Sequence, residues 1–437
     1  MDPRPPEASS DSQPRQPRKI AIISAEYPPE TAAGGIGTYA ATVAPALARA
    51  GCEVTVVSRS LNGSDSLEQR DGVRLLRLVD LAPPEGFWAA PFEQAHVRAA
   101  QDYYQRAYTV AVAFMTMPEL AGNELIEVAD WGGEGALLRA ALADTPIVVR
   151  FHTPARLVAR WNGVGQGADR GFWDALHALE TMAVSNASAW TCPSQWMARP
   201  CEELFGLVPG SVQAIPNPFD AAAFAATTGA AAAIGHISPN AVRGSDIVTI
   251  GRVEARKGVV EGAHAIAKVL ALLPEARWVL AGADTRTAPD GGSMARFLRA
   301  LLPEDLRGRV VVTGSLPREQ LPALLSHAGV VFLPSRHENF PYTCLEAMAT
   351  GAPVVASKHG GMAEMVQNGW SGLLSDPADA DATAKALLRV LLQPCVAETL
   401  GRGAAAAVKR FDPDAVAARL HAQYANTVAA AAAEVRS

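Results

Sequence analysis

The chain has 437 residues, of which 49% are hydrophobic and 19% charged, a globular rather than a disordered composition. This length is enough for two domains, each with its own hydrophobic core. Lys and Arg number 38 against 44 Asp and Glu, and the resulting net charge of −6 argues against nucleic acid as the main partner.

The N-terminal segment and the cysteines exclude further classes. Residues 1–18 are rich in Pro, Ser and Arg and lack the apolar core of a signal peptide, so we expect a disordered lead. No apolar run approaches transmembrane length, and we expect a cytoplasmic protein without an integral membrane segment. The five cysteines form no Cys-x-x-Cys pair and are odd in number, which predicts reduced, packed thiols rather than disulfides or a zinc site.

Residues 19–215 alternate strand and helix patterns, which predicts a parallel, doubly wound α/β sheet. The expected strands cover residues 19–24, 53–58, 73–79, 125–129, 147–151, 189–192 and 212–215. The clearest helical patterns cover residues 39–50, 93–116 and 172–186.

The alternation breaks at Pro216 and resumes at Asp246, so residues 216–245 are expected to link two domains. The second series, within residues 246–410, has expected strands at 246–250, 278–281, 310–313, 330–333, 353–356 and 372–374. Residues 411–437 then contain a helix that starts after Asp412-Pro413 and ends near residue 433.

The segment 330–374 carries the most chemistry. Glu338 follows a strand and a polar loop, and after seven intervening residues Glu346 lies in a helical stretch over residues 343–350. A strand and a loop holding Gly360 and Gly361 come next. In such sheets the loops after the strands bind ligands, and the helix start can seat a phosphate. Glu346 can accept hydrogen bonds from a ribose diol and Glu338 from a second polyol, which together describe a nucleotide sugar.

This segment resembles the donor-binding signature of the retaining glycosyltransferases of family 4. The matching positions are Pro334, Ser335, Glu338, Phe340, Glu346, Ala347, Met348, Ala349, Gly351, Pro353, Val354, Val355 and Ala356. Asn339 and Pro341 stand where the family usually has glycine, and Pro341 has no N–H to offer a sugar hydroxyl. The alternative, a buried strand and helix with solvated glutamates, leaves the joint match unexplained.

The resemblance implies a GT-B fold: two Rossmann-like domains face each other across a cleft, and a C-terminal helix crosses back to the first. It also implies transfer with retention, in which the leaving diphosphate helps to deprotonate the acceptor without a metal or an enzyme nucleophile. The donor contacts implied on the second domain are Glu338, Asn339, Phe340, Tyr342, Thr343 and Glu346, with the base near Leu316.

The segment Gly251–Gly258 follows a strand and fits the family pattern Gly-Arg-x-x-x-x-Lys-Gly. Arg252 and Lys257 are placed to face one anion from a loop. A leaving diphosphate gains negative charge as the glycosidic bond breaks, so these cations would stabilise the transition state. Arg256 is expected to face solvent instead.

Gly34-Gly35-Ile36-Gly37 precedes the first helix. The resemblance places Gly35 and Gly37 against the donor phosphate and Gly34 towards the acceptor. A rival interpretation is a dinucleotide fingerprint, Gly35-x-Gly37-x-x-Ala40. The loop from Ser24 is too long for that motif, and the second strand ends in Ser58-Arg59 rather than an acidic residue.

Three further positions follow expected strands. The resemblance implies that His152 faces the reacting sugar; a structural histidine is the alternative. Trp131 and Glu134 suit the acceptor side, as an aromatic face and a carboxylate for a polyol or an amine, although a loop Trp packed on its own domain fits equally well. Asp379-x-Asp381 begins a helical stretch, where capping explains it better than a metal.

The sequence therefore predicts a hexosyltransferase that uses a UDP- or GDP-type sugar donor and a soluble small-molecule acceptor, with no metal and no cofactor. Such an enzyme would suit the biosynthesis of specialised-metabolite or cell-envelope glycosides. Its catalytic candidates are Glu338, His152, Arg252 and Lys257. The alternatives are a nucleotide-sugar 2-epimerase on the same fold and a non-catalytic nucleotide-sugar-binding protein.

Overall fold

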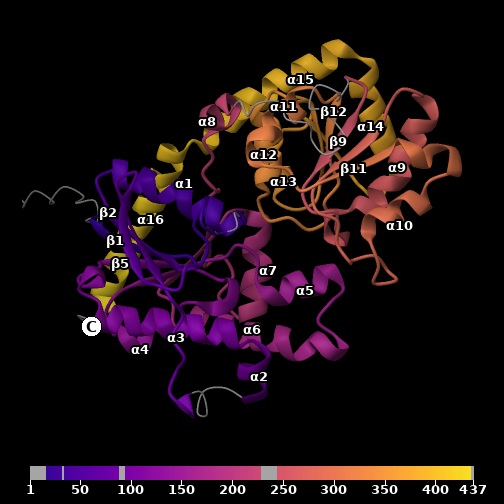
Figure 1. The fold of residues 1–437 in the computed structure, drawn as a ribbon. Coiled ribbons are helices and arrows are strands. Elements are labelled where there is room, and N and C mark those ends of the chain that lie inside the picture. The colour runs from indigo at the N-terminus through magenta and orange to yellow at the C-terminus, as the bar shows by residue number, and fades with distance from the viewer. Residues whose placement is uncertain (1–15, 32–33, 88–93, 228–243, 435–437) are drawn as a thin grey trace, which may run out of the picture.

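The computed structural model describes residues 16–31, 34–87, 94–227 and 244–434, which form two α/β domains (Figure 1). The predicted disordered lead lies outside the described residues up to residue 15. Most of the predicted linker, residues 228–243, also lies outside them.

Within the described residues, the first domain is built on an eight-stranded sheet. In spatial order the strands are β3 (Ser66–Arg70), β4 (Val73–Leu78), β2 (Glu53–Arg59), β1 (Lys19–Ile23), β5 (Leu125–Ala129), β6 (Ile147–Arg150), β7 (Ala189–Cys192) and β8 (Val212–Ala214). Neighbouring strands are parallel except β3 and β4, which form an antiparallel pair at one edge. The seven predicted strands are confirmed within one or two residues, and β3 is the strand that was not predicted.

The helices of the first domain differ from the prediction at two places. They are α1 (Gly35–Arg49), α2 (Gln94–Ala99), α3 (Gln101–Thr116), α4 (Leu138–Ala141), α5 (Ala155–Asn162), α6 (Arg170–Ser185) and α7 (Gln195–Phe205). The helix expected over residues 93–116 is divided at Ala100, whose backbone is non-helical and whose side chain is buried. The first helix starts at Gly35, so the glycine loop forms its first turn.

Within the described residues, the second domain has a six-stranded sheet that is parallel throughout. Its spatial order is β11 (Val310–Gly314), β10 (Trp278–Ala281), β9 (Ile247–Ile250), β12 (Val330–Leu333), β13 (Val354–Ser357) and β14 (Leu373–Ser375). The helices are α9 (Val259–Leu272), α10 (Met294–Leu301), α11 (Leu321–Ser326), α12 (Tyr342–Ala349), α13 (Met362–Met365), α14 (Ala380–Leu392) and α15 (Pro394–Ala407). Apolar clusters cover both faces of this sheet, as expected of a parallel sheet.

The chain passes between the domains twice. The first passage contains α8 (Ala221–Ala226), and there the N–H of Phe219 donates to the carbonyl of Phe411 at 2.8 Å. The second passage is α16 (Pro413–Glu434), drawn in yellow in Figure 1, which returns to the first domain beside α1. On α16, the Tyr424 hydroxyl donates to the buried Glu127 carboxylate of β5 at 2.6 Å. The predicted crossing helix is therefore confirmed.

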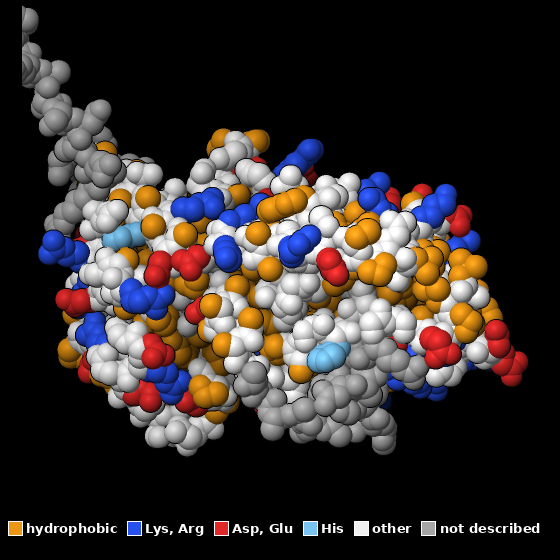
Figure 2. Space-filling model, turned by 90° about the horizontal axis from the view of Figure 1, so that it is seen from above, with side chains coloured by type: hydrophobic (Ala, Val, Ile, Leu, Met, Phe, Trp, Pro, Cys, Tyr) orange, Lys and Arg blue, Asp and Glu red, His pale blue; other side chains and the backbone are white. Residues whose placement is uncertain are grey.

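The surface seen from above carries Lys and Arg side chains interspersed with Asp and Glu (Figure 2). All five cysteines are free thiols, and four of them are buried as predicted, but Cys395 is exposed. In the part of the chain that the structure describes, no helix has both the length and the apolar character needed to cross a membrane.

Candidate active site

A cleft of about 810 Å³ lies between the two domains, and loops from both domains line it. Most of its lining residues follow the carboxyl ends of parallel strands, where α/β sheets bind ligands. Of the predicted site residues, those that line it are Gly34, Gly35, Trp131, His152, Arg252, Lys257, Leu316, Glu338, Asn339, Phe340, Tyr342, Thr343 and Glu346. Lining residues that the sequence analysis did not place there include Glu26, Thr38, Thr153, Asn217, Arg256 and Arg318.

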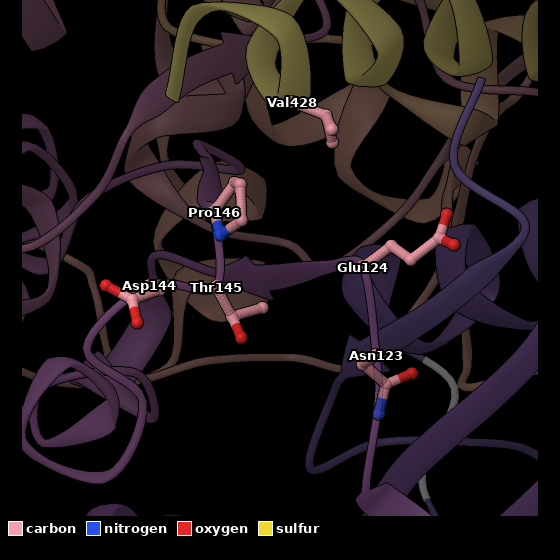
Figure 3. Close-up of a pocket in the computed structure, with 6 residues that line it drawn as sticks. All are labelled: Asn123, Glu124, Asp144, Thr145, Pro146 and Val428. Atoms are coloured by element: carbon pink, nitrogen blue, oxygen red, sulfur yellow. The ribbon is translucent and has the colours of Figure 1, made fainter. Parts of the chain in front are cut away.

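A second hollow, of about 330 Å³, lies at the opposite end of the first sheet. Its lining residues directly precede β5 and β6, and Figure 3 shows Val428 of α16 across from Pro146 and Glu124. The Glu124 carboxylate accepts a hydrogen bond from the N–H of Arg18 at 2.8 Å. Among the described residues, the lining of this hollow includes no Lys or Arg, whereas the lining of the interdomain cleft combines cations with carboxylates from both domains, so the interdomain cleft is the candidate site.

The loop after β9 brings cations into the cleft in an arrangement that corrects one prediction. Arg256, expected to face solvent, is only 16% exposed, and its guanidinium pairs with the carboxylates of Glu254 and Glu338. Arg252 has a 59% exposed side chain and extends from the same loop. Lys257 Nζ lies 2.6 Å from Glu338 Oε1. The cleft therefore has three cations from this loop, of which two are tied to one carboxylate.

Close backbone packing explains the Lys-Gly pair that ends this loop. Gly258 has φ +64°, and a Cβ there would lie 2.0 Å from the carbonyl oxygen of Pro334, so only glycine fits. A Cβ on Gly251 would lie 3.7 Å from Lys257 Cε and 3.8 Å from Thr343 Cγ2. The Lys257 side chain therefore lies beside the first turn of α12, the predicted phosphate seat.

Glu338 is buried, and its carboxylate forms ion pairs with Arg256 and Lys257. Arg256 and Lys257 hold the pKa of its carboxyl down at about 2, against the opposing effect of burial. The N–H of Gly361 donates to the Glu338 carbonyl at 2.9 Å, so the predicted glycine loop supports this segment. Glu338, predicted to accept hydrogen bonds from a second polyol, is thus an ion-paired group with a fixed orientation at the cleft.

Glu346 lies one turn inside α12, where burial raises the pKa of its carboxyl. Its nearest cation is Arg318, with Nε 3.9 Å from Oε1. On the same helix, the Tyr342 hydroxyl oxygen is buried without a hydrogen-bond partner among the described residues. Glu346 and Tyr342 are thus polar groups at the cleft that can still take hydrogen bonds from a ligand.

His152 follows β6 and is held from both domains. Its backbone N–H donates a hydrogen bond to Asp130 Oδ1 at 2.8 Å, and its imidazole ring packs edge-on against Tyr39. Burial and the nearby Arg150 lower the pKa of the imidazole well below its ordinary value, so the ring is neutral. Its carbonyl accepts hydrogen bonds from Asn339 Nδ2 at 2.6 Å and from the Thr153 hydroxyl. The imidazole, rather than the carbonyl, is the part of His152 left to meet a ligand.

Two predicted residues lie behind the cleft wall rather than on it. Glu134 is buried, where it accepts from Arg106 Nε at 2.8 Å and from the Ala25 N–H at 2.9 Å. This pairing corrects its predicted place beside the acceptor. Gly37 is also buried and packs against Glu26. The predicted helix cap at Asp379 is confirmed, since its carboxylate accepts a hydrogen bond from the Ala382 N–H at 2.9 Å.

Glu26 is a carboxylate of the cleft lining that was not predicted from the sequence. It follows β1, and its carboxylate accepts a hydrogen bond from the Gly34 N–H at 3.0 Å. A Cβ on Gly34 would lie 2.5 Å from Glu26 Oε2, so the glycine loop leaves room for this carboxylate. Its position directly after a strand at the binding edge is the sequence signal that could have identified it.

Two facing Rossmann-like domains, a cleft with cations on one wall and a returning C-terminal helix define the GT-B class. Residues 33–223 match the model described as Glycosyltransferase Family 4, and residues 238–407 match Glycosyl transferases group 1. The chain is 30% identical to glycogen synthase of Mycobacterium tuberculosis over 408 residues, which cover 88% of this chain and 89% of that protein. The chain therefore belongs to the GT-B glycosyltransferases of family 4.

Other relatives agree with this assignment. A D-inositol 3-phosphate glycosyltransferase of Acidothermus cellulolyticus is 28% identical, with 93% of this chain and 90% of that protein covered. Sucrose-phosphate synthase of Thermosynechococcus elongatus superposes with a TM-score of 0.69 at 25% identity, covering 95% of this chain and all of the other. Anabaena HepE in complex with UDP and glucose has a TM-score of 0.65 at 18% identity, covers 92% of this chain and 98% of its own, and shows the shared fold.

Proposed function

We propose that the protein is a retaining, metal-independent hexosyltransferase that moves a sugar from a UDP- or GDP-type donor to a small-molecule acceptor. The observation that carries the proposal is the meeting of Arg252, Lys257 and the start of α12 on one wall of the cleft. These groups offer two cations and free backbone N–H donors to one anion, which suits the diphosphate of a nucleotide sugar.

The donor then extends along α12. The ribose diol donates hydrogen bonds to Glu346, the buried carboxylate one turn beyond the helix start. The hexose lies towards Glu338 and the imidazole of His152, which line the same cleft from opposite domains. The named relatives support this donor class, since HepE was solved with UDP and glucose, and the structural neighbours include trehalose-phosphate synthases described as UDP-forming.

In the reaction, the bond between the anomeric carbon and the donor phosphate oxygen breaks, and both electrons leave with the diphosphate. The acceptor hydroxyl attacks the anomeric carbon on the same face, and its proton passes to the departing phosphate oxygen. Arg252 and Lys257 stabilise the charge that grows on the diphosphate, which is the contribution a metal makes elsewhere. Glu338, held between Arg256 and Lys257 with a pKa of about 2, orients the sugar rather than attacking it.

The test uses the full chain with UDP- and GDP-hexoses, each with and without a panel of sugar acceptors. We expect release of nucleoside diphosphate, a product with the donor's anomeric configuration by NMR coupling, and full activity in EDTA. An inverted product or loss of activity in EDTA would refute the retaining or the metal-independent part, respectively. Formation of a C2 epimer from donor alone would instead support the epimerase alternative.

A further inference from the structure

The two walls of the cleft differ in charge. Among the described residues that line it, the second domain contributes Arg252, Arg256, Lys257 and Arg318. The first domain contributes no Lys or Arg to this lining, and Glu26 is its charged residue. A diphosphate therefore finds its cations on the second domain, whereas an acceptor that rests on the first domain meets a carboxylate.

On the first-domain wall, the position where an anion would bind is already occupied by a side chain of the protein. The glycine loop starts the 15-residue helix α1, whose end offers N–H donors of the kind that bind phosphate. Glu26 occupies this position: the Gly34 N–H donates a hydrogen bond to its carboxylate at 3.0 Å, and Gly37 packs against its side chain. Burial raises the pKa of the Glu26 carboxyl above its ordinary value, and hydrogen bonding from the glycine loop opposes that shift. A phosphate brought to this loop would have to displace an internal carboxyl group.

Further carboxyl groups lie behind the same wall. The His152 N–H donates to Asp130, and the N–H groups of Gly132 and Ala155 donate to Glu180. Both carboxyl side chains are fully buried, and neither makes an ion pair within the described part of the chain. The neutral imidazole of His152 adds no positive charge in front of them. In the described part of the chain, the surface of this wall therefore offers a second phosphate no Lys or Arg, and its charged side chain at the cleft, Glu26, would repel one.

We infer that the acceptor is a sugar or cyclitol without a phosphate group, either neutral or amine-bearing, and that Glu26 excludes phosphorylated acceptors. The inference rests on the proposed function and names the acceptor class for the same cleft. Trp131, on the same wall, supplies an aromatic face for such a ring. The D-inositol 3-phosphate glycosyltransferase relative has a phosphorylated compound in its name, so the acceptor class would differ between the two proteins.

The test measures kcat/KM for matched acceptor pairs, namely glucose with glucose 6-phosphate and myo-inositol with its 3-phosphate, together with glucosamine. The deciding quantity is the preference for the phosphorylated member over its neutral partner. We expect a preference below one tenth in the wild type, rising about tenfold in Glu26→Gln, which removes the charge but keeps an oxygen for Gly34. Glu53→Gln, exposed at the amino end of β2, is the matched control and should leave the preference unchanged.

Three outcomes would overturn the inference while the proposed function stands. The first is a wild-type preference for the phosphorylated member, and the second is an unchanged preference in Glu26→Gln. The third is cleavage of the donor by water without transfer to either member of any pair, which would put the acceptor outside this class. Absence of any donor cleavage, with or without acceptor, would instead refute the proposed function itself.

Discussion

Asn339 Nδ2 lies 2.6 Å from the carbonyl oxygen of His152, so a side chain of the second domain donates a hydrogen bond to the backbone of the first. The Asn339 amide oxygen accepts from the Ser194 hydroxyl at 2.8 Å, again across the domains. Asn339 stands where the family signature usually has glycine, which has no side chain to make these bonds. In this chain the position therefore joins the two halves of the cleft next to a candidate catalytic residue.

Asn339→Gly should weaken the contact between the two domains. A buried hydrogen bond contributes about 1 kcal/mol. The substitution removes the interdomain hydrogen bonds of the Asn339 side chain with His152, Phe151 and Ser194, so an open arrangement of the domains becomes easier to reach. We expect a larger radius of gyration in solution scattering without nucleotide and a kcat/KM lower by about tenfold. Asn368→Gly, whose side chain accepts from Leu374 within the second domain, is the control. Identical scattering for Asn339→Gly and wild type would show that other contacts hold the domains.

The contacts of Asn339 show what the sequence could not supply. The Glu338–Glu346 spacing and the Arg252–Lys257 loop are local, so a short segment is enough to predict them. Asn339 and His152 are 187 residues apart, and nothing in either segment indicates that they meet. Arg256 was misjudged for the same reason, because its partner Glu338 comes from another loop.

For the fold too, elements with a local sequence pattern could be predicted, whereas an element that depends on its neighbours could not. Buried strands such as β1 and β12 have continuous apolar runs, which is why they were found. Strand β3 has the sequence Ser-Leu-Glu-Gln-Arg and lies largely exposed at the sheet edge, so its stability depends on pairing with β4 rather than on its own pattern.

Substitutions of the three cations in the loop after β9 should affect activity and folding stability differently. Arg252→Ala and Lys257→Ala should each lower kcat/KM by about 100- to 1,000-fold, because they remove charge that faces the leaving diphosphate. Arg252→Ala should fold normally, since its side chain is mostly exposed. Arg256→Ala should also destabilise the protein by about 3–5 kcal/mol, because it leaves Glu254 and Glu338 buried with one cation fewer. Denaturant unfolding and steady-state kinetics measure both effects, and wild-type turnover of Lys257→Ala would place the diphosphate elsewhere.

The two signature glutamates should fail in different ways. Glu346→Ala removes ribose contacts that are equal in ground and transition states, so it should mainly raise the KM for donor. Glu338→Ala releases Arg256 and Lys257 and frees the sugar at the reacting centre, so kcat should fall more than KM rises. Steady-state kinetics with varied donor give both constants. The reverse pattern would mean that the ribose and sugar ends of the donor have been exchanged.

The last prediction concerns the buried acids behind His152. Burial raises the pKa of Asp130 to about 7, and burial together with the Asp130 charge raises the pKa of Glu180. The folded protein therefore holds a proton that the unfolded chain releases near the ordinary aspartate value. This contribution to stability is complete below about pH 4 and is lost as the pH rises to about 7, at no more than about 1.4 kcal/mol per pH unit for each group.

Asp130→Asn removes the titrating group. The amide oxygen of the new side chain can still accept the hydrogen bond from the backbone N–H of His152. The melting temperature of the variant, measured from pH 4.5 to 8, should therefore improve relative to the wild type as the pH rises. Asp144→Asn, at an exposed position, serves as control, and its profile should run parallel to that of the wild type. Parallel profiles for Asp130→Asn and wild type would mean that Asp130 is ionised throughout this range. The negative charge behind the first-domain wall would then be larger, and the repulsion of a phosphorylated acceptor correspondingly stronger.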